Sequence, residues 1–292
     1  MPEGDTLHRT ANRLRPALAG RPLVRLTLHH ASGGGRRPQA GERIETVEAV
    51  GKHLLIRFER GTTLRTHMRM AGSWHLYRSG ERWRKRPELA RAVVEVDGWT
   101  AVCFAAPVVE LTDGSSAAAK IAHLGPDLTR ADITDDDIAT AAERMPALVD
   151  PRDEIANVML DQRVACGVGN VYKSESLFAC GVNPFTPVGT INVDTRRRLL
   201  ATASRLLRLN TNGGGPRATV RGGLAVYGRA RQPCHRCGTL VEARRQGQQA
   251  RTTYWCPECQ PQAGVVLRRD GRASRGEGSA GDVSQPSERA RP

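Results

Sequence analysis

The sequence predicts an α+β protein of more than one domain: an N-terminal helix with antiparallel strands, then a helical region, then a small four-cysteine module. Two observations carry this prediction. Short strands separated by turn residues fill residues 22–112, and two Cys-x2-Cys pairs lie near the C-terminal end. At 292 residues the chain is long enough for two domains, each with a core of its own.

We expect the chain to open with an amphipathic helix over residues 3–19. Its apolar positions recur at spacings of four, three and four residues, which places on one face Leu7, Ala11, Leu14 and Leu18. Gly20 is a typical stop signal after the last turn. Pro16 conflicts with this prediction because proline removes a backbone donor, so it should kink the helix or end it one turn early.

Antiparallel strands are predicted between residues 22 and 112. One hairpin is expected across residues 53–68 with its turn at Gly61, and another across residues 92–104 with its turn at Asp97-Gly98. Several short strands joined by such turns favour an antiparallel sandwich or a barrel. The cysteines of this region and of the middle of the chain lie among apolar residues and are expected to be small buried side chains: Cys103, Cys166 and Cys180.

The second half of the chain changes to a helical pattern. A linker is predicted to begin at Gly125-Pro126 and to lead into a helix, and residues 152–208 are expected to be mostly helical. At their centre, Gly167-Val168-Gly169-Asn170 forms a predicted turn between two helices. Beyond Gln260 the chain is rich in Arg, Gly and Ser and is expected to be disordered.

The charge of the chain indicates a polyanionic partner. The chain carries 44 Lys and Arg against 30 Asp and Glu, a formal charge of +14, and residues 261–292 account for only +2 of it (six Arg, four acids). A basic folded body favours nucleic acid first and an anionic membrane surface second. No apolar run approaches the roughly 20 residues of a membrane span, and no leader is apparent, so we expect a soluble cytoplasmic protein.

The strongest local motif is a pair of cysteine knuckles. Eighteen residues separate the two Cys-x2-Cys pairs, which consist of Cys234, Cys237, Cys256 and Cys259. Four thiolates make a closed tetrahedral site, which is typical of one structural Zn²⁺; a redox pair is the alternative. The segment between the knuckles is rich in arginine and is expected to form a hairpin. Arg251 on it is the candidate to touch nucleic acid, against the alternative of a solvated arginine.

The turn at residues 167–170 is a candidate phosphate site. Two glycines allow close approach of another backbone, and the first N–H groups of the following helix are suited to bind a phosphate. Asn170 can cap that helix or donate to a phosphate. A lone Gly-x-Gly-Asn is a weak signal, and its weight here comes from the flanking helices and the basic chain.

The start of the chain offers a nucleophile. Removal of Met1 would leave the secondary amine of Pro2 at the terminus, beside the carboxyl of Glu3. A terminal amine titrates near about pH 7.7–8.0 and can form a Schiff base with a sugar C1′. The positive end of the following helix would help keep this amine neutral. The alternative is that Met-Pro-Glu occurs here by chance.

Two further segments are candidates for contacts with a duplex. Lys52 lies in a turn before a strand, where a surface lysine is the ordinary interpretation. The segment 66–72 carries Arg69 and Met70, long side chains that could enter a duplex as wedges. Core packing is the alternative, most of all for Met68.

Taken in order, these motifs resemble one family, the formamidopyrimidine-DNA glycosylase and endonuclease VIII family of base-excision enzymes. The matching segments span residues 2–260 and are Pro2-Glu3-Gly4, Gly51-Lys52, residues 67–72, residues 167–170, Val226-Tyr227-Gly228-Arg229, and the cysteine knuckles with Arg251. The resemblance implies a catalytic β-sandwich domain (1–124), a linker with a helix–two-turn–helix DNA-binding domain (125–222), a zinc-finger hairpin (223–260) and a basic tail (261–292).

The resemblance also implies roles for individual residues. Pro2 would be the nucleophile, and Glu3 the acid and base that assists ring opening. Lys52 would donate a proton in β-elimination, and Arg251 would grip phosphates and support δ-elimination. Contacts with DNA would come from Asn170, Arg69, Met70, Lys173, Tyr227 and Arg229. The damaged nucleotide would be flipped out of the stack.

The branch of the family is indicated by two segments. Pro2-Glu3-Gly4 resembles endonuclease VIII, in particular its second actinobacterial type, and the stretch from Phe104 to Glu110 lacks the arginines and phenylalanine of the formamidopyrimidine branch. Oxidised pyrimidines in duplex DNA are therefore the expected substrates, acted on by a monomer associated with the nucleoid. Asp5-Thr6 and Ala71 depart from the family pattern, the latter standing where an aromatic wedge is usual.

Two alternatives stay open. The same chemistry could act on oxidised purines, with residues 210–223 covering the lesion. A non-catalytic DNA-binding zinc-finger protein is a different class, and it would have no need of Pro2, Glu3 and Lys52 together.

Overall fold

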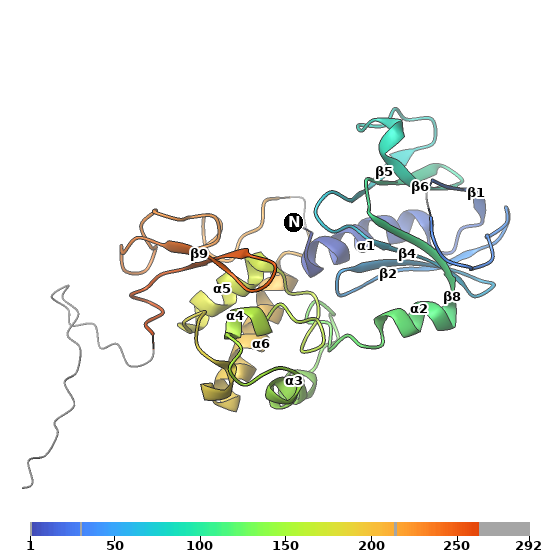
Figure 1. Cartoon of the computed structure of the whole chain (residues 1–292). Coiled ribbons are helices and arrows are strands. Elements are labelled where there is room, and N and C mark those ends of the chain that lie inside the picture. The colour runs from blue at the N-terminus through green and yellow to red at the C-terminus, as the bar shows by residue number, and fades with distance from the viewer. Residues whose placement is uncertain (1, 30, 213–214, 263–292) are drawn as a thin grey trace, which may run out of the picture.

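A computed structural model describes residues 2–29, 31–212 and 215–262. The chain forms two lobes, a β-sandwich with the N-terminal helix and a helical lobe that carries a C-terminal hairpin (Figure 1). Most of the predicted tail, from residue 263 onward, lies outside the described residues.

Helix α1 spans Gly4–Leu18 and confirms the predicted amphipathic helix. All four residues of the predicted stripe are buried, and the helix packs against the sandwich. The prediction that Pro16 ends the helix early is wrong, since Ala19 still donates its N–H to Arg15. The donor lost at Pro16 would have served the carbonyl of Asn12, which lies on the exposed face, and the buried residues Ala17 and Leu18 keep the last turn in place.

The strands form two separate antiparallel sheets, which confirms the sandwich and excludes the barrel. One sheet has the order β2-β3-β4-β8 and the other β1-β6-β7-β5. Their bounds are β1 Leu23–Leu28, β2 Ile44–Val50, β3 His53–Phe58, β4 Thr62–His67, β5 Ser73–Arg78, β6 Ala90–Val96, β7 Trp99–Phe104 and β8 Val108–Asp113. Alternating residues of both sheets and of α1 share one core, in which Cys103 is fully buried as expected.

The helical lobe follows a short helix that the sequence reading did not predict, α2 (Gly114–Ile121), capped by Asp113. Its other helices are α3 (Asp135–Leu148), α4 (Ile155–Val158), α5 (Asn170–Cys180) and α6 (Val193–Leu209), with 3-10 turns elsewhere at Pro87–Leu89 (η1) and Val188–Thr190 (η2). The hairpin of β9 (Glu242–Gln246) and β10 (Arg251–Trp255) packs on α5. None of the helices in the described part of the chain is long and apolar enough to cross a membrane.

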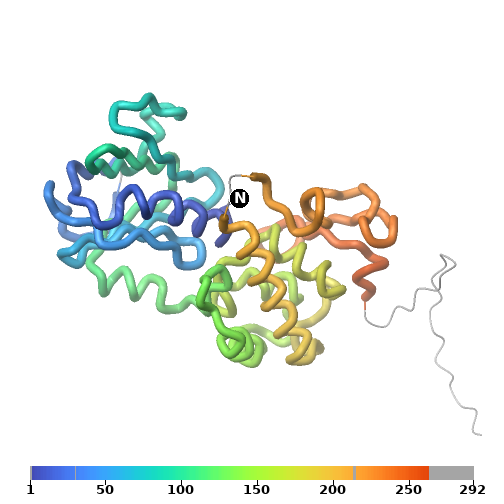
Figure 2. Tube along the Cα trace, turned by 180° about the vertical axis from the view of Figure 1, so that it is seen from behind, coloured from blue at the N-terminus to red at the C-terminus, as the bar shows by residue number. Residues whose placement is uncertain are grey.

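The two lobes meet at the start of α1, which points out of the sandwich toward the helical lobe (Figure 2). Gly4 donates its N–H to the carbonyl of Gly167 at 2.8 Å. A Cβ on Gly4 would lie 2.4 Å from Thr129 Oγ1 and 2.9 Å from Gly167 Cα, so only glycine allows this approach. The contact brings Pro2 and Glu3 against the turn at residues 167–170.

Candidate functional site

A cleft of about 1180 Å³ lies between the lobes. Its walls include five residues that the sequence predicts to act together, and they come from the chain start, two turns of the sandwich and the C-terminal hairpin: Pro2, Lys52, Arg69, Met70 and Arg251. Met1 lies outside the described residues, so its removal stays a prediction. The cleft therefore gathers the predicted nucleophile, proton donor, wedge and phosphate-binding arginine at one place.

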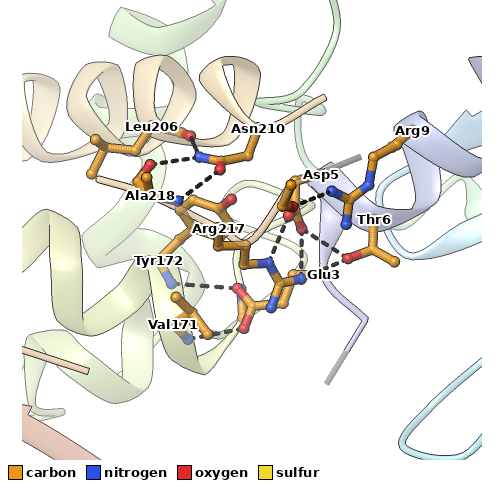
Figure 3. A network of polar contacts seen from close by, with 12 residues as sticks. Glu3, Asp5, Thr6, Arg9, Val171, Tyr172, Leu206, Asn210, Arg217 and Ala218 are labelled. Atoms are coloured by element: carbon orange, nitrogen blue, oxygen red, sulfur yellow. Dashed lines mark hydrogen bonds and ion pairs between the residues drawn. The ribbon is translucent and has the colours of Figure 1, made fainter. Parts of the chain in front are cut away.

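Glu3 lies directly behind Pro2 and is completely buried. Its carboxylate accepts hydrogen bonds from the N–H groups of Val171 (2.9 Å) and Tyr172 (3.3 Å) at the start of α5 (Figure 3). It also accepts the N–H of Gly169, the residue before the helix, at 2.9 Å. The expectation that these N–H groups bind a phosphate is therefore corrected. The sequence does not reveal this acceptor, because the carboxylate comes from the other lobe. A helix N-terminus binds a carboxylate as readily as a phosphate.

The environment of Glu3 favours its protonated form. Burial raises the pKa of the Glu3 carboxyl, and the hydrogen bond from Val171 and the positive charges of Arg217 and Lys52 oppose this shift. A carboxyl with a raised pKa keeps its proton to a higher pH than an ordinary glutamate and is therefore available as a general acid. Glu3 is therefore suited to exchange protons with a group bound at Pro2.

A buried ion pair fastens the next turn of α1 to the loop after α6. Arg217 donates to Asp5 through Nε (2.6 Å) and Nη2 (2.8 Å), and Nη2 also lies 2.6 Å from Thr6 Oγ1 (Figure 3). Asp5 is fully buried, and the Arg217 side chain is 17% exposed. Asp5 and Thr6, which depart from the family pattern in the sequence, are thus the residues of α1 that Arg217 binds. This set of contacts is called the Arg217 clamp below. Sequence reasoning missed Arg217 because its partner lies 212 residues away.

Lys52 is held at the cleft by Asp127, a residue that sequence reasoning also missed. Gly51 donates its N–H to Asp127 Oδ2 at 2.7 Å, and the same oxygen lies 2.9 Å from His8 Nε2 on α1. Burial lowers the pKa of Lys52 to about 8, and the charge of Glu3 opposes this shift. The Lys52 side chain is thus poised to hold or release a proton near neutral pH.

Asn170 and Lys173 join α5 to β10. The amide of Asn170 donates to the carbonyl of Thr252 at 2.7 Å, whereas Gly169 occupies the cap position, so the predicted capping role of Asn170 is wrong. The ammonium of Lys173 donates to Asn170 Oδ1 and Thr253 Oγ1, both at 2.7 Å. Lys173 is only 1% exposed. It supports Asn170 and the hairpin that carries Arg251, and its DNA contact stays a prediction.

Arg69 and Met70 form an exposed tip between β4 and β5. Met70 is 73% exposed, while Met68 is buried, so the core-packing alternative holds for Met68 alone. Arg69 has a φ of 43°, which turns the chain sharply at the rim of the cleft. Long side chains in this position are suited to enter a gap between base pairs.

Tyr227 and Arg229 lie in the segment that leads into the finger, and neither is among the residues that line the cleft. The Tyr227 ring packs edge-on against Tyr254 at 5.0 Å, and its DNA contact stays a prediction. The guanidinium of Arg229 donates to the carbonyls of Ala225 and Pro233. These bonds hold Arg229 within the finger turn, and its DNA contact stays a prediction.

The four knuckle cysteines converge as the sequence predicts. Their sulfur atoms all lie within 4.8 Å of one another, and three of the separations are 3.4, 3.5 and 3.9 Å. None of these four cysteines takes part in a disulfide. Such a cluster at the base of the β9–β10 hairpin is a candidate metal site.

The fold and the site define a class of enzyme, the DNA glycosylases that also cut the strand at an abasic site. Residues 1–107 match the formamidopyrimidine-DNA glycosylase N-terminal domain, and residues 124–220 match the helix–two-turn–helix domain of the same enzymes. The chain belongs to the formamidopyrimidine-DNA glycosylase and endonuclease VIII family, whose members act in base-excision repair.

Its relatives include several actinobacterial enzymes. The chain is 41% identical to a probable endonuclease 8 2 of Streptomyces coelicolor, over 93% of this chain and 98% of that one. It is 37% identical to the DNA-(apurinic or apyrimidinic site) lyase Nei2 of Mycolicibacterium smegmatis, over 89% and 99%. Among solved structures, the Lactococcus lactis formamidopyrimidine-DNA glycosylase bound to DNA with an oxidised pyrimidine has the same fold (TM-score 0.76, 19% identity, 89% and 100% covered).

Removal of Arg217 should destabilise the protein strongly. Arg217→Met leaves the buried carboxylate of Asp5 without its partner, and we expect a loss of about 3–5 kcal/mol in the free energy of unfolding, measured by urea denaturation. Arg130→Met is the matched control, because its pair with Asp132 is exposed and should contribute no more than about 1 kcal/mol. Equal losses of unfolding free energy in the two variants would contradict a stabilising role for the Arg217 clamp.

Lys173 should give the protein a stability that rises with pH. Burial lowers the pKa of Lys173 to about 7, whereas an unfolded lysine titrates near about 10.4. Between these values the unfolded chain binds more protons, so the free energy of unfolding rises by up to about 1.4 kcal/mol per pH unit. Urea denaturation of wild type and Lys173→Met between about pH 7 and pH 10 should show the smaller slope in the variant. Parallel curves would refute the lowered pKa of Lys173.

Proposed function

We propose that this enzyme excises oxidised pyrimidines from duplex DNA through a Schiff base on Pro2, followed by β,δ-elimination. One observation carries the proposal: Pro2 opens into a cleft shared with Lys52, Arg69, Met70 and Arg251, with the Glu3 carboxyl directly behind it. This arrangement supplies a nucleophile, two proton-transfer groups, a wedge and a phosphate anchor. All of them come from one chain, which supports action as a monomer.

The proposed reaction begins when the amine of Pro2 attacks C1′ of the flipped nucleotide. The glycosidic bond breaks, the base leaves with the electron pair, and it takes up the proton that the Pro2 nitrogen loses. The Glu3 carboxyl protonates the ring oxygen O4′, the sugar opens, and an iminium forms between Pro2 and C1′.

Strand cleavage follows from the iminium. Loss of a proton from C2′ expels the 3′ phosphate, and a second elimination expels the 5′ phosphate. Lys52 is placed to transfer a proton in these steps because its pKa, lowered by burial to about 8, lies near neutral pH. Arg251 lines the same cleft and is placed to hold the phosphates that depart.

The pyrimidine preference is supported by the wedge region and by the relatives. The loop between β7 and β8 consists of Ala105, Ala106 and Pro107, so it offers no long side chain as a second wedge. The more similar relatives are named endonuclease 8. If oxidised purines were the substrates, the loop after α6 would have to cover the lesion. Arg217 of this loop is instead bound to Asp5, which favours the pyrimidine preference.

Borohydride trapping on abasic duplexes tests the chemistry. Protein that has lost Met1 should form a covalent adduct, and Pro2→Gly should reduce its rate by at least about 100-fold. Normal DNA affinity of Pro2→Gly would show that the loss is chemical. If wild-type protein without Met1 forms no adduct, the non-catalytic DNA-binding alternative is favoured.

The same assay on base lesions tests the branch. Duplexes with 5-hydroxyuracil or thymine glycol should be cut faster than a duplex with 8-oxoguanine, measured as kcat/KM. Faster cutting of 8-oxoguanine would select the oxidised-purine alternative and leave the Pro2 mechanism intact.

We infer that the metal of the four-cysteine cluster is zinc. A tetrahedral zinc with Zn–S bonds of ~2.3 Å places its sulfur atoms ~3.8 Å apart, close to the separations at this site. Four thiolates leave no position for a catalytic water, so the ion would be structural. It would hold the base of the hairpin whose strand β10 begins with Arg251.

Metal analysis tests this assignment. The protein should contain about one zinc per chain, and Cys256→Ser should lose it and lower the stability of the finger by several kcal/mol. Cys180→Ser, outside the cluster, is the matched control and should keep the metal. Full DNA affinity after removal of the metal by a chelator would show that the hairpin does not depend on it.

A further inference from the structure

A second surface of the sandwich carries a concentration of positive charge. The loop between β5 and β6, residues 79–89, is called here the basic loop; it projects from the sandwich (Figure 1). Four of its eleven residues are cations, Arg82, Arg84, Lys85 and Arg86. Its two acids, Glu81 and Glu88, leave it net positive.

The arginines of the basic loop are exposed and, within the described part of the chain, have no ion-pair partner. Among the residues that the structure describes, no carboxylate pairs with Arg82, Arg84 or Arg86, and all three are exposed. By contrast, three other arginines of the same sandwich each pair with a glutamate: Arg25, Arg57 and Arg65. Exposed guanidinium groups without a local carboxylate are available to an external anion.

The basic loop is held in shape by an aromatic anchor. The ring of Trp83 stacks on Tyr77 at 6.4 Å and meets Phe104 edge-on at 5.7 Å. The N–H of Arg84 donates to the hydroxyl of Tyr77 at 3.1 Å. A preformed loop presents its cations to a ligand at a lower entropic cost than a mobile one.

The basic loop is also anchored beside the cleft. Lys85 donates to Ser73 Oγ at 2.8 Å. Ser73 begins β5, three residues after Met70 at the rim of the cleft. The loop is therefore placed next to the tip that would enter the duplex.

We propose that the basic loop binds backbone phosphates of the duplex on one side of the damaged nucleotide. It extends the footprint beyond the cleft and contributes affinity without reading sequence, because guanidinium–phosphate contacts carry no base information. The inference rests on the proposed function in one respect, that duplex DNA occupies the cleft.

A triple variant tests the proposal by salt dependence. Arg82→Gln, Arg84→Gln and Arg86→Gln together remove three charges. The control removes three exposed arginines of α6, none of which lines the cleft: Arg198→Gln, Arg205→Gln and Arg208→Gln. Affinity is measured by fluorescence anisotropy from low to moderate salt, on duplexes of about 12 and about 30 base pairs with a central abasic-site analogue.

On the long duplex, the basic-loop variant should bind about tenfold more weakly than wild type, and its slope of log affinity against log salt should be smaller by about 2 to 3. On the short duplex the two proteins should differ little. The basic loop is proposed to contact the duplex on one side of the damaged nucleotide only. Two further long duplexes, each with the analogue near a different end, should therefore differ: one should show the loss of affinity in the basic-loop variant, and the other should not.

Three outcomes would overturn the proposal: equal salt slopes for wild type and the basic-loop variant, an equal effect in the α6 control, or an equal loss on both duplex lengths. Equal salt slopes would indicate that the basic loop does not bind DNA and serves a different partner. Borohydride trapping on the short abasic duplex separates this proposal from the proposed function. If wild-type protein forms no adduct, the lyase activity is rejected, while the comparison of DNA affinities still tests the basic loop.

Discussion

The carboxylate of Glu3 at the N-terminus of α5 is the interaction on which the site depends. It buries the proposed catalytic carboxyl of one lobe among three backbone N–H groups of the other. The approach is possible only because Gly4 and Gly169 have no side chains, since a Cβ on Gly169 would lie 2.3 Å from Glu3 Cδ. The same contact therefore joins the two lobes and positions the Glu3 carboxyl next to Pro2.

Helix α5 also positions further residues of the proposed DNA-binding surface. Lys173 on its buried side holds Asn170 and β10, so the position of Arg251 follows from the helix. Glu175, one turn from Val171, accepts the N–H groups of Val226 and Tyr227 at 2.9 and 2.8 Å and fixes the entry to the finger. Charged groups buried on α5 thus position the C-terminal hairpin and the segment that leads into it, since each must be paired where it lies.

Much of this architecture could be predicted from the sequence, because its signals are local. The stripe of α1, the turns between strands and the spacing of the cysteines each lie within a few residues of what they specify. The rest depends on partners distant in the chain. Asp127 and Arg217 have no local signal, and the burial of Lys173 follows from packing against β10. The Pro16 prediction failed because tertiary packing outweighed one missing hydrogen bond.

The measurement that tests the account most directly is amide hydrogen exchange by NMR in the DNA-free protein. The N–H groups of Gly169, Val171 and Tyr172 precede or begin a helix, where amides ordinarily lack intrahelical acceptors and exchange quickly. If Glu3 occupies this position, all three should be protected as strongly as the centre of α5, and Glu3→Ala should remove the protection. Fast exchange of these three amides in the wild-type protein would contradict the account.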